Sequence, residues 1–238
     1  MNKFSSKEPI QFPLQFCFSS DTSFDNFIVS NKPNSASAEA VEALKNNEYK
    51  LVFIWGNSTV GKTHLLQAIF NHYIEKQLPS YFLPFQHIDS FEIDMLENLE
   101  YQSLLCIDDI HLIAGHENWE HALFHLFNRF TESGNRLVFS ANANAENIPF
   151  VLPDLKSRLQ WGLTYQLQSL DDDEKILALI KRAEEKQLAL SKELASYLLR
   201  RVSRDMGELI ELLEKLDYAS LAEQRKLTIP FVKHFLKL

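Results

Sequence analysis

The chain has 238 residues, a net charge of −8 at pH 7 and a hydrophobic fraction of 45%. This apolar content excludes an intrinsically disordered chain, and the length suits one large domain, alone or with a small one. The negative charge disfavours strong binding to duplex DNA, because phosphate contacts need clustered lysine and arginine. No apolar run reaches the length of a membrane span and no signal peptide opens the sequence, so we expect a cytoplasmic protein without a membrane partner.

Residues 1–20 read as a tail, since Pro9 and Pro13 interrupt any regular element. The tail is nevertheless rich in large apolar residues, namely Phe4, Ile10, Phe12, Leu14, Phe16 and Phe18. Two interpretations stay open. These side chains fold back onto the domain, or the segment is a short linear motif that fills a pocket on a partner.

The first regular elements surround a glycine loop. Small and apolar residues at helical spacing predict a helix over Ser35–Leu44, and β-forming residues predict a strand over Lys50–Trp55. After the loop, His64–Lys76 again has the spacing of a helix. The loop matches the pattern G-x-x-x-x-G-K-T and consists of Gly56, Asn57, Ser58, Thr59, Val60, Gly61, Lys62 and Thr63. This pattern between a strand and a helix is typical of the phosphate-binding P-loop.

A P-loop binds phosphate through its backbone. Its glycines let successive N–H groups point at phosphate oxygens, and the helix that follows adds the free N–H groups of its first turn. Lys62 would reach the β- and γ-phosphates, and the Thr63 hydroxyl would ligate Mg²⁺. We therefore expect a nucleotide with Mg²⁺ as the cofactor.

A second acidic motif follows further along the chain. The pattern predicts a short strand over Tyr81–Leu83, a helix over Phe91–Glu100 and an apolar strand over Ser103–Ile107. The last strand ends in Asp108-Asp109, the Walker B arrangement, in which the first acid holds Mg²⁺ through water. Asp109 stands where a base that orients the attacking water is expected.

An amphipathic helix is predicted over Trp119–Phe130 and closed by Gly134. His121 and His125 fall opposite its apolar face, and their spacing fits no zinc motif, so we interpret them as a solvated pair.

The remaining core elements are two strands and a loop. A fourth strand is predicted over Arg136–Ser140, a loop over Pro149–Leu155 and a fifth strand over Leu159–Leu167. Asn142 follows the fourth strand, beside the Walker motifs, where its side chain would face the γ-phosphate; an ordinary turn asparagine is the alternative.

From Ser169 onward the pattern is helical. Asp171 caps a helix that ends near Lys186, Ser191 opens a second, and Thr228 opens the last. A leucine stripe marks the helix between them, at Leu209, Leu212, Leu213 and Leu216. We divide the chain into a tail (1–20), an α/β nucleotide-binding domain (21–168) and an all-helical domain (169–238).

Together these segments resemble the DnaA branch of the AAA+ ATPases, which has a P-loop α/β core with a five-stranded parallel sheet and a small helical lid. The resemblance rests on the Asp-Asp strand end and on the segments FDNF, ESGNRLVFSAN, LPDLKSRLQWG and QRKLTIPFVKHFLKL. Within this branch the chain is similar to DnaA-homologous regulators of replication initiation. It stops after the lid, where a DnaA initiator continues into a DNA-binding domain.

The resemblance implies roles for single residues. Arg158 matches an arginine finger, which acts in trans on a neighbour's γ-phosphate, while Asp109 and Asn142 would assist hydrolysis. The lid position of a DnaA-type sensor arginine is occupied by Gly207, and Arg204, one turn earlier, would have to substitute for it. The resemblance implies ADP or ATP, with Mg²⁺, as the cofactor, and the glycine at the sensor position leads us to expect weak intrinsic ATPase activity.

The resemblance also interprets the tail. Gln11, Phe12, Leu14 and Phe16 match a peptide that binds the DNA sliding clamp. The implied partners are DnaA and the clamp, with DNA reached only through the clamp; monomer and homodimer both stay open. Three functions follow: a regulator that promotes hydrolysis of DnaA-bound ATP, a self-standing ATPase that remodels or loads another protein, and, least favoured by the charge, a DNA-bound initiator.

Overall fold

The computed structural model describes residues 22–30, 32 and 35–237. Its centre is a sheet of five parallel strands in the order β2-β3-β4-β1-β5. The strands are β1 (Leu51–Trp55), β2 (Ser80–Pro84), β3 (Leu104–Asp108), β4 (Arg136–Ala141) and β5 (Leu163–Gln166). The five-stranded parallel sheet expected from the sequence is thereby confirmed.

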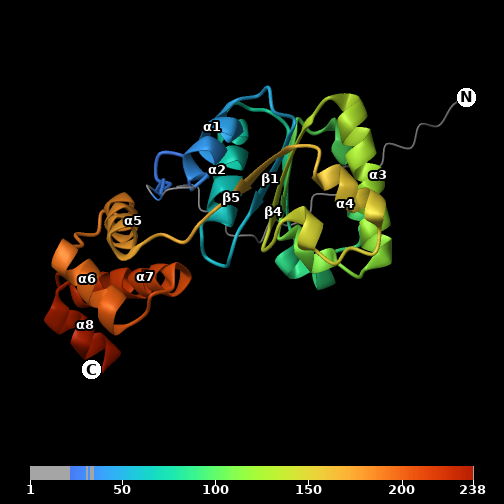
Figure 1. Cartoon of the computed structure of the whole chain (residues 1–238). Coiled ribbons are helices and arrows are strands. Elements are labelled where there is room, and N and C mark those ends of the chain that lie inside the picture. The colour runs from blue at the N-terminus through green and yellow to red at the C-terminus, as the bar shows by residue number, and fades with distance from the viewer. Residues whose placement is uncertain (1–21, 31, 33–34, 238) are drawn as a thin grey trace, which may run out of the picture.

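Helices cover both faces of this sheet (Figure 1). One face carries α1 (Ser37–Lys45) and α2 (Lys62–Glu75), and the other carries α3 (Glu117–Ser133) and α4 (Pro153–Leu159). Strand residues alternate between the two layers, so that Cys106 packs under α2 while Ile107 packs under α3. Because both faces are covered, all five residues of β3 are buried, which explains the unbroken apolar run in its sequence.

A buried arginine ties α1 to the sheet. Arg136, at the start of β4, is 1% exposed. Its guanidinium donates hydrogen bonds to the carbonyl oxygens of Leu44 and Ala43, at 2.8 and 2.7 Å. These carbonyls belong to the last turn of α1 and have no partner within the helix, so the cation both satisfies and electrostatically stabilises the helix end.

Two local predictions were wrong. The helix expected over Phe91–Glu100 is instead a pair of 3₁₀ turns, Ile93–Leu96 and Leu99–Tyr101. Asn98, between them, has a φ of +63°, a left-handed conformation that interrupts a right-handed helix.

The second wrong prediction concerns the region after residue 149. The loop and long strand expected there contain helix α4, and β5 begins only at Leu163. Pro153 occupies the first turn of α4, where its missing N–H has no cost, and Leu155 and Leu159 bury one face of the helix.

The helical lid consists of α5 (Asp172–Glu185), α6 (Lys192–Arg201), α7 (Met206–Glu223) and α8 (Ile229–Leu236), which enclose their own apolar cluster. Each helix begins at a residue whose side chain accepts a backbone N–H, and these residues are Asp171, Ser191, Asp205 and Thr228. The sequence indicated three of them, all except Asp205. Such caps each stabilise a helix by about 1 kcal/mol.

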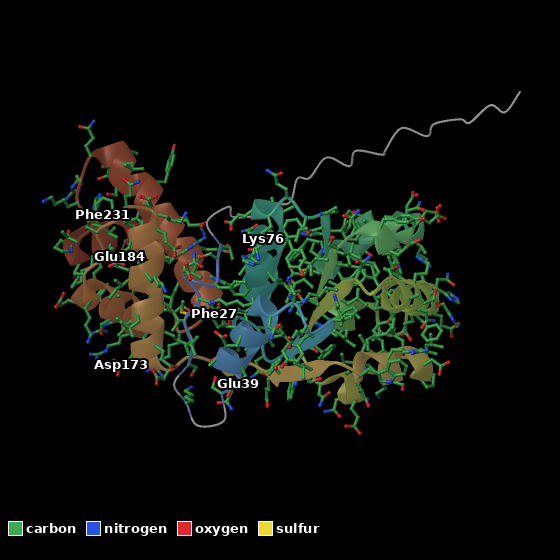
Figure 2. The ribbon with its side chains drawn as sticks, turned by 90° about the horizontal axis from the view of Figure 1, so that it is seen from above. Phe27, Glu39, Lys76, Asp173, Glu184 and Phe231 are labelled. Atoms are coloured by element: carbon green, nitrogen blue, oxygen red, sulfur yellow. The ribbon has the colours of Figure 1, made fainter. Side chains whose placement is uncertain are left out.

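Residues 22–30 form a strip between the core and the lid, and Figure 2 shows Phe27 at this boundary. On the core side, Asn71 of α2 donates to the Thr22 carbonyl at 2.7 Å. On the lid side, Lys181 donates to the Asp25 carbonyl, and the Ser30 hydroxyl lies 3.0 Å from the Glu174 carboxylate. The strip therefore joins the two parts by contacts with both.

Candidate nucleotide-binding site

The P-loop connects β1 to α2, as the sequence predicts, and its glycines are required by space as well as by φ. Gly61 has a φ of +96°, and a Cβ added there would lie 2.8 Å from the ring of Phe27. A Cβ at Gly56 would lie 2.5 Å from the Leu167 carbonyl oxygen. Any other residue at these two positions would push the loop away from the strip or from the end of β5.

Lys62 holds the loop from inside. Its ammonium donates to the carbonyl oxygens of Gly56, at 2.9 Å, and Asn57, at 2.7 Å, and the residue is 7% exposed. Burial lowers the pKa of Lys62, while the carboxylates of Asp109 and Asp108 oppose that shift. The cation therefore lies where the phosphate charges of a nucleotide would be neutralised.

The Walker B carboxylate lies directly beside the P-loop. The Thr63 hydroxyl donates to Asp108 Oδ2 at 2.7 Å, and the Ser140 hydroxyl of β4 donates to Asp108 Oδ1. Asp108 is 2% exposed, and burial raises the pKa of its carboxyl group. A hydroxyl and a carboxylate at this separation are the hard oxygen groups that Mg²⁺ prefers, so the donor set fits the expected ion.

Several polar side chains also surround Asp109. Its backbone is left-handed, with a φ of +56°, and its N–H donates to the Ser140 hydroxyl at 2.9 Å. Its carboxylate accepts a hydrogen bond from Gln86 at 2.8 Å and lies 3.9 Å from His111 Nδ1. The side chain expected to orient water is thus fixed by its hydrogen bond with Gln86.

His111 also connects this group to the end of β4. Its Nδ1 accepts the backbone N–H of Asn142 at 3.3 Å. Burial lowers the pKa of His111, which keeps the ring neutral at physiological pH, with its proton on Nε2. This contact with His111 is made by the backbone of Asn142, whose side chain is exposed, and the expected role of Asn142 at the γ-phosphate stays a prediction.

Gln86 and His111 were missed by the sequence analysis. Gln86 follows the carboxyl end of β2, and His111 comes two residues after Asp109. Polar residues at the carboxyl ends of neighbouring parallel strands meet at one edge of the sheet, and that rule would have found both.

A cavity of about 240 Å³ adjoins the P-loop, between the strip 22–30 and the lid. Its exposed lining area is mainly apolar, from residues such as Phe27, Ile28, Val60, Met206 and Ile210, and polar side chains including His64, Arg182 and Glu185 also line it. His64 Nε2 donates to the Ser23 carbonyl at 3.0 Å, and burial lowers the pKa of this imidazole. An apolar hollow next to a phosphate-binding loop fits the planar base and sugar of a nucleotide.

The lid contributes a carboxylate to the P-loop. The Thr59 hydroxyl donates to Asp205 Oδ2 at 2.8 Å, and this bond lowers the pKa of Asp205. Asp205 also caps α7 through the Glu208 N–H. A Cβ on Gly207 would lie 3.4 Å from Thr59 Cγ2, so the start of α7 lies directly against the loop.

Comparison with known families agrees with this geometry. Residues 18–166 match the family model of the bacterial DnaA ATPase domain. The chain belongs to this family. Residues 172–236 match a second model, described as the lid domain of Hda. The core is therefore DnaA-like and the lid Hda-like, as the sequence segments indicated.

Relatives extend over nearly the whole chain. A Haemophilus influenzae protein, described as uncharacterized, is 41% identical over 233 residues, which is 96% of this chain and 99% of that protein. Domain III of the Thermotoga maritima replication initiation protein DnaA superposes with a TM-score of 0.76 at 26% identity, covering 91% of this chain and 96% of that one. AMPPCP-bound DnaA from Aquifex aeolicus, with a TM-score of 0.66, 24% identity and coverage of 87% and 69%, shares the fold.

Arg158 of this DnaA-family chain belongs to a different layer of the fold from α2, the helix that follows the P-loop. It is carried by α4, on the face of the sheet opposite α2 (Figure 1). Its guanidinium carbon lies 3.9 Å from the ring centroid of Trp161 and 5.8 Å from that of Phe124. Trp161 is 61% exposed, so the stacked pair is at the surface.

Arg204 was named as a substitute for the DnaA-type lid arginine. Its side chain forms an ion pair with Asp172 Oδ2 at 3.0 Å and is 71% exposed. The neighbouring Asp205, and not Arg204, forms a hydrogen bond with the P-loop at Thr59, and Gly207 also lies against Thr59.

Two further observations complete the site. The proposed clamp-binding residues Gln11, Phe12, Leu14 and Phe16 lie outside the described residues. None of the helices within the described part of the chain is long and apolar enough to cross a membrane.

Proposed function

We propose that this DnaA-family protein is a regulator of replication initiation, which binds ADP or ATP with Mg²⁺ and promotes hydrolysis of the ATP held by DnaA. The observation that carries the proposal is the union, in one chain, of a DnaA-type ATPase core and an Hda-type lid. The protein would act in the cytoplasm, as a monomer or a homodimer, and would reach DNA only through the sliding clamp.

The roles of the residues divide between two surfaces. Gly56 to Thr63 would hold the nucleotide phosphates, and Thr63 and Asp108 would hold Mg²⁺, the latter through water. Arg158, half-buried beside the exposed ring of Trp161, would enter the nucleotide site of a neighbouring DnaA molecule. A guanidinium there stabilises the charge that spreads over the transferred phosphoryl group.

The tail would bring the two ATPase proteins together. Gln11 would form hydrogen bonds in a pocket of the sliding clamp, and Phe12, Leu14 and Phe16 would supply the apolar anchors that dominate small interfaces. Binding to a clamp loaded on DNA would raise the local concentration of the regulator near DnaA.

The test is hydrolysis of DnaA-bound ATP, measured with and without this protein, DNA-loaded clamp and ADP. Wild type is compared with Arg158→Ala and with a Gln11→Ala/Phe16→Ala double variant. We expect stimulation that requires the clamp and disappears in both variants, with a loss of about 10³-fold for Arg158→Ala. Unchanged stimulation in Arg158→Ala would refute the finger assignment.

The second candidate is a self-standing ATPase that remodels or loads another replication protein. The intact Gly-Lys-Thr sequence and the Thr63–Asp108 contact favour this reading. Gly207 disfavours this candidate, because it occupies the lid position of the DnaA-type sensor arginine. Brisk ATP hydrolysis by the protein alone, without any effect on DnaA, would support this candidate and exclude the first.

A further inference from the structure

Glu120 of α3 is a buried carboxylate outside the nucleotide site. It is 0% exposed and lies on the helix face that also buries Trp119 and Leu123. An acidic side chain on such a face loses its hydration, and hydrogen bonds from the protein must compensate for that loss. Its partners therefore indicate what the residue does.

The partners of Glu120 are three backbone N–H groups from two loops. Oε1 accepts from Gly115 at 2.8 Å and from Val151 at 3.1 Å, and Oε2 accepts from Leu152 at 2.7 Å. Gly115 lies between the Walker B strand and α3, while Val151 and Leu152 lead directly into α4. One carboxylate thus joins the two segments.

The contact with Leu152 is significant because Leu152 is the N-cap residue of α4, and no side chain of its own caps the helix. Apart from the Arg158 contact with Phe124 of α3, α4 is attached through the apolar residues Leu155 and Leu159, which are 1% and 0% exposed. Apolar packing holds a helix against a face but is non-directional. The directional bonds to Glu120 fix where α4 begins.

Arg158 is carried six residues after Leu152 on this seven-residue helix. A helix this short is rigid, so a displacement of its first turn moves Arg158 by a similar amount. The guanidinium is also aligned by the Trp161 ring, 3.9 Å away. We propose that Glu120 is a positioning residue, which fixes the start of α4 and thereby aims Arg158 at the partner's nucleotide.

This proposal rests on the proposed function in one respect only, the action of Arg158 on the nucleotide of a partner. The link from Glu120 to α4 is tested without DnaA, by Glu120→Gln, which keeps the shape of the side chain but presents an N–H₂ group to one of the three donors. Glu117→Gln, one turn earlier on the same helix and exposed, is the matched control. The readout is the NMR signal of the Trp161 indole N–H.

We expect this signal to shift or broaden in Glu120→Gln and to stay in place in Glu117→Gln. An unchanged Trp161 signal in a folded Glu120→Gln protein would overturn the proposal. Because DnaA is absent, this outcome is independent of whether the proposed function holds.

The second readout is stimulated hydrolysis of DnaA-bound ATP. Glu120→Gln should lower the maximal rate by about tenfold to a hundredfold, which is the effect of a misplaced catalytic group, and leave the half-saturating concentration unchanged. Glu120→Gln should have no further effect in an Arg158→Ala background. Additive losses would show that Glu120 acts by another route and would overturn the proposal. If Arg158→Ala alone has no effect, the proposed function fails, and the Trp161 signal still decides the link to α4.

A measurement on the wild-type protein covers the case in which Glu120→Gln fails to fold. Val151 as a whole residue is 53% exposed, so its amide should exchange rapidly with solvent unless the hydrogen bond to Glu120 protects it. We expect protection of the Val151 and Leu152 amides against hydrogen exchange, by at least about a hundredfold over an unstructured peptide. Exchange at the unprotected rate would overturn the proposal.

Discussion

Gly61→Ala tests whether the P-loop and the strip 22–30 form one packed unit. At a φ of +96°, alanine is strained by about 1–2 kcal/mol. Its Cβ would lie 2.8 Å from Phe27, well inside the 3.4 Å at which ordinary contact begins. Overpacking of this kind adds about 1–3 kcal/mol, so we expect the free energy of unfolding to fall by about 3 kcal/mol.

Two variants separate strain from contact. Gly134→Ala, at a φ of +68° and with nothing within 4 Å of the added Cβ, carries only the strain. Phe27→Leu removes the ring edge, so Gly61→Ala should cost only about 1–2 kcal/mol in that background. The assays are urea unfolding and titration with fluorescent ADP.

We expect Gly61→Ala to lower the affinity for ADP at least about tenfold, because the loop must move away from Phe27 and its N–H groups would no longer point inward. Gly134→Ala should bind ADP as wild type does. If Gly61→Ala is no less stable than Gly134→Ala and binds ADP normally, the packing of Phe27 does not constrain the loop, and the reasoning is wrong.

Three further predictions concern single contacts. Asp108→Asn should lower ADP affinity by about tenfold in the presence of Mg²⁺ and leave it unchanged in EDTA, as measured by calorimetry. Arg136→Met should lower the free energy of unfolding by about 2–4 kcal/mol, because two α1 carbonyls lose their partner, without changing ADP affinity. Thr59→Val should lower the free energy of unfolding by less than about 1 kcal/mol at neutral pH, since the hydrogen bond to Asp205 is partly exposed. The Asp205 carboxyl has a lowered pKa, so its contribution is present above the ordinary pKa of about 3.9 and is lost as the pH falls through the folded value. The difference in Tm between Thr59→Val and wild type should therefore vanish in strong acid, and a difference that persists there would contradict this assignment.

The features that the sequence predicted well are those with local causes. The P-loop depends on glycines at fixed spacing, and the helix starts at Asp171, Ser191 and Thr228 depend on one side chain reaching a nearby N–H. The parallel sheet follows from apolar strands alternating with helices. Each of these signals lies within a few residues of the structure that it specifies.

The features that were missed have distant causes. The Ser140 hydroxyl donates a hydrogen bond to Asp108 on the neighbouring strand, whereas the sequence analysis identified Ser140 only as the end of a predicted strand. Helix α4 was taken for a loop and a strand because seven residues contain too few turns to show a helical period. The roles of Arg158 and of the clamp-binding peptide came from resemblance alone, and they stay predictions.

The arrangement of charge around the nucleotide site bears on the choice between a self-standing ATPase and a regulator. The core supplies a buried ammonium, Lys62, and a carboxylate, Asp108, beside the Thr63 hydroxyl. The lid supplies a carboxylate, Asp205, which contacts the loop, while Arg204 is paired with Asp172 instead. Asp205 thus places negative charge against the loop at Thr59, and the lid cation Arg182 lines the neighbouring cavity. Arg158, the proposed arginine finger, is carried by α4, on the other face of the sheet. In the proposed function, binding of one nucleotide and attack on another therefore belong to separate surfaces, and this separation supports action on a partner's ATP over turnover of the protein's own.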